Sequence, residues 1–536
     1  MKINLQGISD RKQWEEKGFD LPQYDIAQMK EATMENPFWV HFGAGNLFRA
    51  FHASIAQKML NEGVLDRGIV VAEGFDYEII EKVYVPHDNL GISMTLRADG
   101  TVGKMVIGSV AEALPLDSDN SAAYARLREI FEKDSLQMVT FTITEKGYSL
   151  TDAKGEYLSE VLDDFAKGPE KPVSYMGKVT ALLYARFCAG EKPVAMVSTD
   201  NCSHNGDRLY AAVLAFAEAW SANKKVDTGF RKYIDSEKVS FTWSMIDKIT
   251  PRPDAAVEEI LTKDGVEGLE PVITSRKTYT APFVNAEETE YLVIEENFPN
   301  GRPSLEDAGV LFTNRETVDK VEKMKVCTCL NPLHTCLAIF GCLLGYRKIA
   351  DEMRDEALVR LVEGVGYQEG LPVVVNPGII DPKKFLDTVL NVRFPNPFMP
   401  DTPQRIATDT SQKLAIRFGE TLRAYETSDT LKVENLQMIP LVYAGWLRYL
   451  MAVDDKGEPF DPSPDPMLEE LRPQLEKIRL GDRDVEAVLR PIMENTQIFG
   501  VNLYKTGLAE KVCGYFRKLN TEPGAVRRTL DKLGTF

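Results

Sequence analysis

The first three hundred residues of the chain alternate β-rich runs with helical stretches, and this alternation limits the possible folds most strongly. The β-rich runs are 38–46, 68–75, 104–110, 137–148 and 194–201, and clear helical stretches are 47–62, 121–133 and 177–189. Strand, loop and helix repeating in this order predict a doubly wound parallel sheet. The turn Asp99–Gly100 predicts an added antiparallel hairpin.

The pattern changes after about residue 305, where β-rich alternation becomes scarce. The later segments predicted to be mostly helical are 318–346, 350–363, 404–425, 436–453, 466–478 and 483–493. Segment 296–309 is rich in Pro, Gly and Asn, so we expect a hinge there. The prediction is an α/β Rossmann-type domain over 1–300 and a mostly α-helical domain over 301–536.

Composition excludes several classes of protein. The chain has 536 residues, of which 44% are hydrophobic, and its net charge of −18 argues against nucleic-acid binding. The most apolar stretches, 337–346 and 441–453, are too short to span a membrane, and the N-terminus lacks the apolar core of a signal peptide. Seven scattered or clustered cysteines form no secreted disulfide pattern. We expect a cytoplasmic protein without nucleic-acid or membrane partners.

A glycine-containing loop follows the apolar run 38–40 and leads into a helical stretch. Its candidate cofactor-binding residues are Gly43, Gly45, Asn46, Phe48 and Arg49. Glycines let the backbone approach a pyrophosphate, and the next helix supplies free N–H groups. Phe48 replaces the third glycine of the usual fingerprint, so a plain strand–helix turn remains the alternative.

Two acidic residues follow the next predicted strand. Glu73 and Asp76 are placed where a carboxylate accepts hydrogen bonds from an adenosine ribose. A carboxylate there would repel a 2′-phosphate, which favours NAD over NADP. The alternative for either residue is an exposed acidic loop.

Polar segments also stand where further strands should end, which is where open α/β sheets bind ligands. These segments are 144–148, which contains Thr144 and Glu145 as further cofactor candidates, then 198–206, 245–251 and 322–335. Together with the glycine loop they occur in the order seen in one enzyme family. With Gly301-Arg302-Pro303 before the last of them, the chain resembles the polyol-specific long-chain dehydrogenase (mannitol dehydrogenase) family from about residue 41 to about 420.

The resemblance implies a Rossmann-type N-terminal domain, a helical C-terminal domain and NAD(P)-dependent chemistry that needs no metal. It implies that Lys325 is the catalytic lysine and that Asn201 and Asn331 polarise the reacting oxygen. The remaining implied roles are substrate binding by His334, Asp247, Arg405 and Lys413, and a proton path through Glu322.

The chemistry of ketone reduction suits these residue types independently. Hydride transfer to a ketone develops negative charge on oxygen, which two asparagine amides can stabilise as hydrogen-bond donors. A lysine can supply the proton, and it does so best near neutral pH when burial or a nearby cation lowers its pKa. Without the resemblance, Lys325 would be read as a solvated lysine and Asn201 as part of a polar turn.

The spacing of Lys325 and Asn331 departs from the family pattern by one extra residue. Six positions on an ideal helix rotate by about 600°, so the two side chains would point apart. Pro332 also removes a backbone donor. We predict a one-residue π-type bulge before Pro332 that returns Lys325 to the site.

Within the family the segment Thr144-Glu145-Lys146-Gly147-Tyr148 is most similar to the uronate reductases. This implies NAD-dependent interconversion of D-fructuronate and D-mannonate by a monomer or weak homo-oligomer. Activity as a mannitol 2-dehydrogenase or a tagaturonate reductase is the alternative.

Two readings from other classes also remain open. Cys327, Cys329, His334 and Cys336 are of zinc-binding type, although their spacing is unusually tight, and they would suit a zinc-stabilised binding protein. The other reading is a Rossmann-fold protein that senses NAD without turnover.

Overall fold

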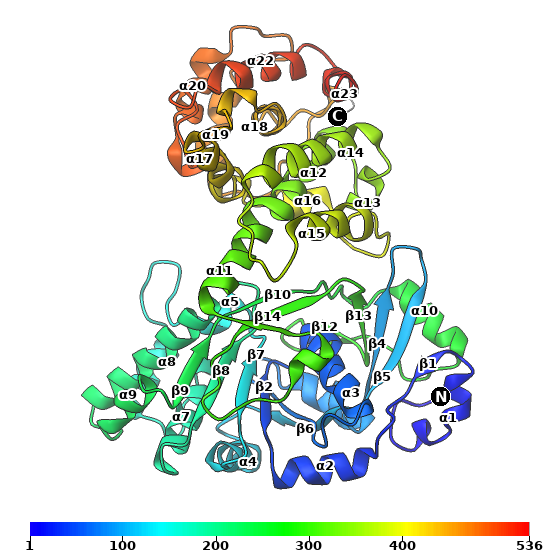
Figure 1. Ribbon diagram of the computed structural model, residues 1–536, viewed down its shortest axis with the longest axis vertical. Coiled ribbons are helices and arrows are strands. Elements are labelled where there is room, and N and C mark those ends of the chain that lie inside the picture. The colour runs from blue at the N-terminus through cyan, green and yellow to red at the C-terminus, as the bar shows by residue number, and fades with distance from the viewer. Residues whose placement is uncertain (535–536) are drawn as a thin grey trace. The chain divides into compact units, whose positions relative to one another are not determined.

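The computed structural model describes residues 1–534, and these form two compact units. The first comprises residues 1–97 and 101–318, and the second comprises residues 98–100 and the described residues from 319 onward. Figure 1 labels their helices and strands.

The first unit is built on a six-stranded parallel sheet, in the order β6-β3-β2-β7-β8-β9. The strands are β2 (Trp39–Phe42), β3 (Ile69–Glu73), β6 (Val110–Pro115), β7 (Met138–Phe141), β8 (Val194–Ser198) and β9 (Val239–Thr242). The order reverses between β2 and β7, as in a doubly wound fold. The predicted Rossmann-type sheet is therefore confirmed.

Both faces of this sheet are covered by helices. Alternate residues of β2 and β3 enter different core clusters: Val40 and Val70 pack in one, Trp39 and Val71 in the other. The helices of the unit are α1 (Arg11–Glu15), α2 (Ile26–Glu35), α3 (Ala53–Asn61), α4 (Ser121–Glu132), α5 (Thr144–Tyr148), α6 (Ser159–Lys167), α7 (Tyr175–Cys188), α8 (Asn205–Ala222), α9 (Gly229–Ile234) and α10 (Ala255–Asp264). Burial on both faces explains why these strands read as continuous apolar runs.

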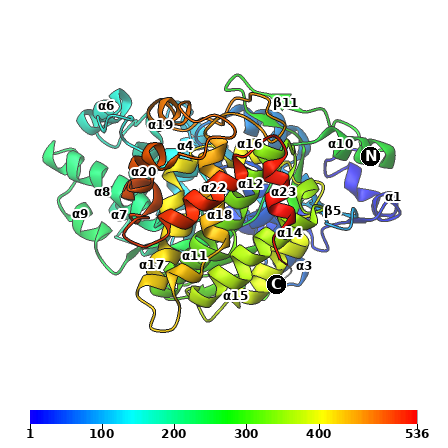
Figure 2. The ribbon, with the colours of Figure 1, turned by 90° about the horizontal axis from the view of Figure 1, so that it is seen from above.

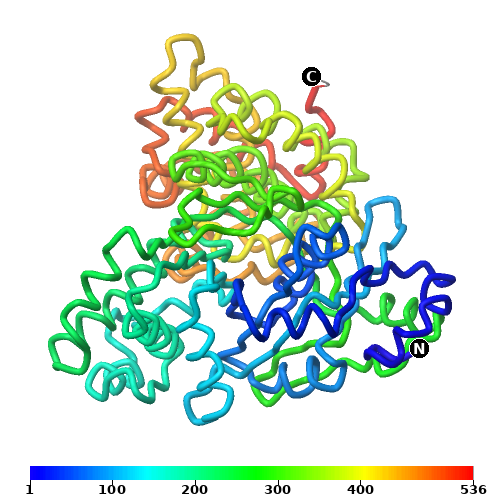
Figure 3. The backbone as a smooth tube through the Cα atoms, turned by 60° about the horizontal axis from the view of Figure 1, so that its bottom comes forward, coloured from blue at the N-terminus to red at the C-terminus, as the bar shows by residue number. Residues whose placement is uncertain are grey.

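Smaller sheets complete the first unit. One has the order β1-β5-β4-β13 and contains the predicted hairpin, because β4 and β5 pair antiparallel; another has the order β10-β14-β15; and β11 pairs with β12. Their strands are β1 (Phe19–Asp20), β4 (Gly91–Leu96), β5 (Val102–Ile107), β10 (Ser244–Asp247), β11 (Val272–Ile273), β12 (Tyr279–Thr280), β13 (Phe283–Glu287), β14 (Tyr291–Glu295) and β15 (Leu311–Thr313). The N-terminal segment lies beside residues near 267 through a bridge between Lys2 and Glu267 (Figure 3).

The segment expected to be a hinge, 296–309, belongs to the first unit. The Asn300 amide donates to the carbonyls of Asp134 and Leu136, and β15 then pairs with β14. The division between the units falls between Val318 and Asp319, which differs from the predicted 300/301 boundary. The Pro and Gly residues correctly predict an irregular loop, but hydrogen bonds from Asn300 to the segment before β7 make it part of the first unit.

The second unit is helical, and its central helix is α12 (Asn331–Leu344), which packs against α18 (Met438–Tyr449) (Figure 2). A π-helical turn, η6 (Lys325–Cys329), connects α11 (Arg315–Met324) to α12. The other helices are α13 (Ile349–Glu352), α14 (Glu356–Glu363), α15 (Pro382–Thr388), α16 (Pro403–Ile406), α17 (Glu420–Glu426), α19 (Leu468–Leu475), α20 (Glu486–Met493), α21 (Thr496–Phe499), α22 (Ala509–Leu519) and α23 (Ala525–Asp531). The predicted helical half is thus confirmed.

One helical stretch of the described residues, 315–344, is long and apolar enough to cross a membrane by length and composition alone. Of its most apolar window, 78% is buried within the structure. Most of this stretch therefore lies in the core of the protein.

Candidate active site

A cavity of about 510 Å³ lies in the first unit at the carboxyl ends of β2, β3 and β7. It is lined by the turn after β2, the end of β3 and the segment after β7 (residues 142–150), together with residues 174–176 at the start of α7. This is the point at which the strand order reverses, where doubly wound sheets bind dinucleotides. The volume falls in the usual range for small-molecule sites.

Two glycines allow the backbone to border this cavity closely. Gly43 has φ = +106°, and a Cβ built on it would lie 2.3 Å from the carbonyl oxygen of Thr142. A Cβ on Gly45 would meet no atom within 4 Å, so that position faces open space. The cradle therefore suits a pyrophosphate held by backbone N–H groups.

Glu73 is buried at the end of β3 and holds the turn at residues 43–45 by a hydrogen bond to its backbone. Its carboxylate accepts hydrogen bonds from the backbone N–H of Ala44 (2.8 Å), Phe75 (2.8 Å) and Asp76 (3.1 Å). Burial raises the pKa of Glu73 in spite of these donors. The carboxylate of Asp76 accepts from the Thr274 hydroxyl at 2.6 Å. Glu73 lines the cavity, so its carboxylate can reach a ribose bound there, as predicted.

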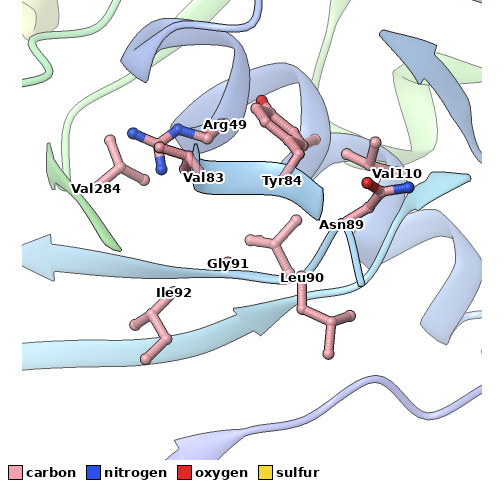
Figure 4. A pocket seen from close by; sticks show the side chains of 11 residues that line it. Arg49, Val83, Tyr84, Asn89, Leu90, Gly91, Ile92, Val110 and Val284 are labelled. Atoms are coloured by element: carbon pink, nitrogen blue, oxygen red, sulfur yellow. The ribbon is translucent and has the colours of Figure 1, made fainter. Parts of the chain in front are cut away.

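Asn46, Phe48 and Arg49 do not belong to the lining of this cavity among the described residues. Phe48 lies in the core, where its ring stacks on His41 with centroids 4.4 Å apart. The Arg49 guanidinium donates to the Asn46 side chain and to Thr280 and Ala281. Figure 4 shows Arg49 beside Val83 and Tyr84 around a separate void of about 10 Å³, roughly one water in size. In this structure these three side chains hold the loop together.

Asp200 organises the segment after β7, and the sequence analysis did not single it out. Its carboxylate accepts from the backbone N–H of Ile143 and Thr144 and from the Tyr148 hydroxyl, at 2.9, 2.7 and 2.6 Å. Thr144 lines the cavity with φ = +65°, a conformation that a branched residue adopts only when its surroundings enforce it. Glu145 is exposed and forms an ion pair with Arg208 at 2.9 Å. A buried acid directly after a strand was the available signal for Asp200.

Two other predicted site residues of the first unit also stand at strand ends. Asn201 lies in the exposed loop after β8, and Asp247 is the buried last residue of β10, opposite Tyr291 of β14.

Lys325 begins the π-helical turn of the second unit and is only 4% exposed. The N–H of Leu330 donates to the Lys325 carbonyl at 3.1 Å, a five-residue step characteristic of a π-turn. The predicted bulge is therefore present before Pro332. The side chain of Lys323 is 54% exposed and forms an ion pair with Asp319 at 2.7 Å, so Lys325 is the buried lysine of the two.

Asn331 and His334 occupy the first turn of α12. The His334 ring packs against Phe394 with centroids 4.4 Å apart and ring planes inclined by 31°, and its Nε2 lies 3.7 Å from the Asp401 carboxylate. Burial lowers the pKa of His334 to about 4, more than Asp401 raises it. The ring is consequently neutral at pH 7. Glu322 is half-buried, near Cys327, on the turn before Lys325.

Cations gather around His334 within the second unit. Arg393, Arg405 and Arg417 all lower the pKa of His334, and Arg405 and Arg417 also lower that of Lys413. Arg405 forms an ion pair with Asp401, and the Lys413 ammonium donates to the Thr408 carbonyl. Arg405 and Lys413 were predicted from the sequence, whereas Arg393 and Arg417 were not. The arrangement suits an anionic group in a chain that is acidic overall.

The cysteines near His334 are the residues on which the zinc-binding alternative rests. No group of three or more metal-binding side chains is placed to hold an ion among residues 1–534. Cys329 and Cys336 are buried, and burial raises the pKa of Cys327 and Cys329 to about 12. The zinc-stabilised alternative therefore has no support from this geometry.

Comparison with known proteins gives matches over both units. The family model described as "Mannitol dehydrogenase Rossmann domain" matches residues 38–307, and the one described as "Mannitol dehydrogenase C-terminal domain" matches residues 317–517. D-mannonate oxidoreductase of Thermotoga maritima is 52% identical over 99% of both chains.

Two solved structures are also similar. D-sorbitol dehydrogenase in its substrate-free form has a TM-score of 0.78 at 26% identity, covering 95% of this chain and 97% of that one. Pseudomonas fluorescens mannitol 2-dehydrogenase, in a ternary complex with NAD and D-mannitol, has a TM-score of 0.69 at 26% identity, covering 99% and 100%.

Proposed function

Because this chain belongs to the mannitol dehydrogenase family and is an oxidoreductase acting on a CH–OH group, we propose that it interconverts D-fructuronate and D-mannonate with NAD as cofactor. The observation that carries the proposal is its 52% identity, over its whole length, to a D-mannonate oxidoreductase. The cations around His334 support the choice of a sugar acid, because a neutral polyol offers them no counter-charge.

The cavity at the sheet's switch point is the proposed NAD site. Gly43 and Gly45 leave room for the pyrophosphate, and Glu73 stands where a 2′-phosphate would be repelled. The similar Pseudomonas fluorescens enzyme was solved with NAD. When bound, the reduced cofactor supplies the hydride.

Residues of the chain bind the reacting oxygen and transfer the proton. Asn201 and Asn331 donate hydrogen bonds to the carbonyl oxygen and stabilise its developing charge. Lys325, which is buried, supplies the proton to the carbonyl oxygen and accepts it in the reverse reaction. Glu322, on the preceding turn, connects that proton with solvent.

The remaining side chains orient the sugar acid. His334, neutral because burial lowers its pKa, contacts a substrate hydroxyl, and Asp247 lines the site near the end of β10. Arg405 and Lys413 contact hydroxyl or carboxylate oxygens. We place the protein in the cytoplasm as a monomer or weak homo-oligomer.

The test is NADH oxidation with D-fructuronate, tagaturonate and fructose side by side, followed by loss of near-ultraviolet absorbance. The proposal predicts the largest kcat/KM with fructuronate. A preference for fructose or tagaturonate would show that the proposed substrate is wrong, while the proposed class of reaction would still hold. If NADH does not bind, the proposed cofactor site is wrong. If NADH binds but none of the three substrates is reduced, the NAD-sensing alternative is favoured.

A further inference from the structure

Arg417 belongs to the cation group around His334, and among the described residues it has neither an ion pair nor a carbonyl partner. It lies in the π-helical turn η11 (Ala415–Gly419), partly buried. Its single hydrogen bond runs from Nη1 to the hydroxyl of Thr335. A guanidinium has five N–H donors, so most of them are left without a protein acceptor.

Other arginines of the same unit are satisfied differently. Arg405 pairs with Asp401, and Arg423 pairs with Glu420 at 3.0 Å. Arg448, which is more deeply buried, donates to the carbonyls of Val453 and Asp454. Arg417 is partly buried and none of its nitrogens is among the buried atoms without a partner, so its remaining N–H groups stay accessible to a ligand that supplies the opposite charge.

The hydrogen bonds of Thr335 connect Arg417 to the site residues of α12. The Thr335 hydroxyl accepts from Arg417 and donates to the carbonyl of Asn331 at 3.0 Å. His334 is the residue before Thr335, and Arg417 influences its pKa. The guanidinium therefore lies against the helix turn that carries two proposed substrate contacts.

We propose that Arg417 binds the substrate carboxylate and thereby makes this site select sugar acids over neutral ketoses. This inference rests on the proposed function. Two parallel N–H groups of the guanidinium match the two oxygens of a carboxylate, a geometry that lysine cannot provide. In fructuronate the carboxylate lies at the far end of the carbon chain from the ketone, so Arg417 acts on binding and not on proton transfer.

The experiment measures kcat and KM for D-fructuronate and D-fructose in the wild type, Arg417→Met, Arg417→Lys and the control Arg354→Ala. Arg354 is an exposed arginine of the same unit, paired with Asp351. Arg417→Met should raise KM for fructuronate by about 100-fold, from the loss of charged hydrogen bonds, and change kcat and the fructose reaction by less than about threefold. The KM of Arg417→Lys for fructuronate should lie between those of the wild type and Arg417→Met, and the Arg354→Ala control should have the kinetic constants of the wild type.

A merely structural role would change both substrates equally. Equal losses for fructuronate and fructose, or no loss in Arg417→Met, would overturn the inference and leave the proposed function intact. If the wild type itself fails to reduce fructuronate, the proposed function fails, and the assignment of Arg417 fails with it. Should Arg417→Met not fold, Arg417→Lys retains the charge and gives the same comparison of substrates.

Discussion

The two units build their functional surfaces from different parts of the polypeptide. In the α/β unit the cavity is bordered by backbone: the turn at Gly43, the N–H groups held by Glu73 and the strained segment held by Asp200. In the helical unit the candidate residues are long charged side chains, Lys325 and Arg417 among them, placed by irregular helical turns. Backbone surfaces suit a cofactor that many enzymes share, whereas side chains suit the choice of substrate.

The buried acids differ in how far their hydrogen bonds are satisfied. Glu73 and Asp200 each accept three hydrogen bonds, and most of these come from backbone N–H groups of the loops they organise. Glu352 is buried in the helical unit, and neither of its carboxylate oxygens has a hydrogen-bond partner among the described residues. Glu369, which is also buried in the helical unit, accepts from the backbone N–H groups of Gln437, Met438 and Ile439, so Glu352 is an unsatisfied acid in a unit that satisfies others.

The largest effect is expected from Lys325→Ala. Removal of a general acid lowers kcat by about 10³-fold, whereas binding of NADH, which belongs to the other unit, should change by less than about twofold. Lys323→Ala is the matched control, because Lys323 is exposed and paired with Asp319. Steady-state rates and NADH fluorescence titration measure the two quantities. A variant that loses NADH binding together with turnover would contradict the separation of roles.

The two cavity glycines should respond differently. Gly43→Ala introduces a Cβ 2.3 Å from the Thr142 carbonyl at a positive φ, so it should lower the melting temperature and weaken NADH binding by more than about tenfold. Gly45→Ala meets no protein atom within 4 Å, so it should weaken NADH binding and leave the melting temperature unchanged. Differential scanning fluorimetry and titration separate these outcomes. Equal melting temperatures for the two variants would contradict the close contact described at Gly43 and the open space described at Gly45.

Glu352→Gln tests the unsatisfied acid of the helical unit. Burial raises the pKa of Glu352 well above its ordinary value, so the folded state keeps a proton that the unfolded state releases above about pH 4.5. Wild-type stability therefore falls as pH rises from there toward the folded-state pKa. The variant should match the wild type near pH 4 and melt a few degrees higher at pH 8. A difference that does not vary with pH would contradict this.

The smallest effect concerns His334. Its pKa of about 4 means that it stays neutral across the working range, so it should contribute no step near pH 6.5 to the profile of kcat/KM. His334→Asn should raise KM and leave the shape of that profile unchanged. A step near pH 6.5 that disappears in the variant would show that the ring titrates.

Local patterns predicted the fold and part of the cavity from the sequence. Alternating β-rich and helical runs indicated the sheet, and one extra residue with Pro332 indicated the π-turn, because both depend on neighbours in the chain. Phe48 and Arg49, expected to bind cofactor, have side chains in the core and in hydrogen bonds to residues 280–281, because a glycine-loop pattern describes backbone and not side-chain direction.

Arg417 and Asp200 depend on contacts that the sequence does not show. Arg417 becomes informative only when Thr335, distant in sequence, is its one partner, and Asp200 only when Ile143 and Thr144 lie against it.

The most direct test of the central claim, that the helical unit selects a sugar acid for a NAD site in the α/β unit, is oxidation in the reverse direction. Purified protein with NAD is given D-mannonate or D-mannitol at equal concentration, and initial formation of NADH is measured. The account predicts rapid NADH formation with mannonate and at least about a hundredfold less with mannitol. Equal rates, or a preference for mannitol, would contradict it.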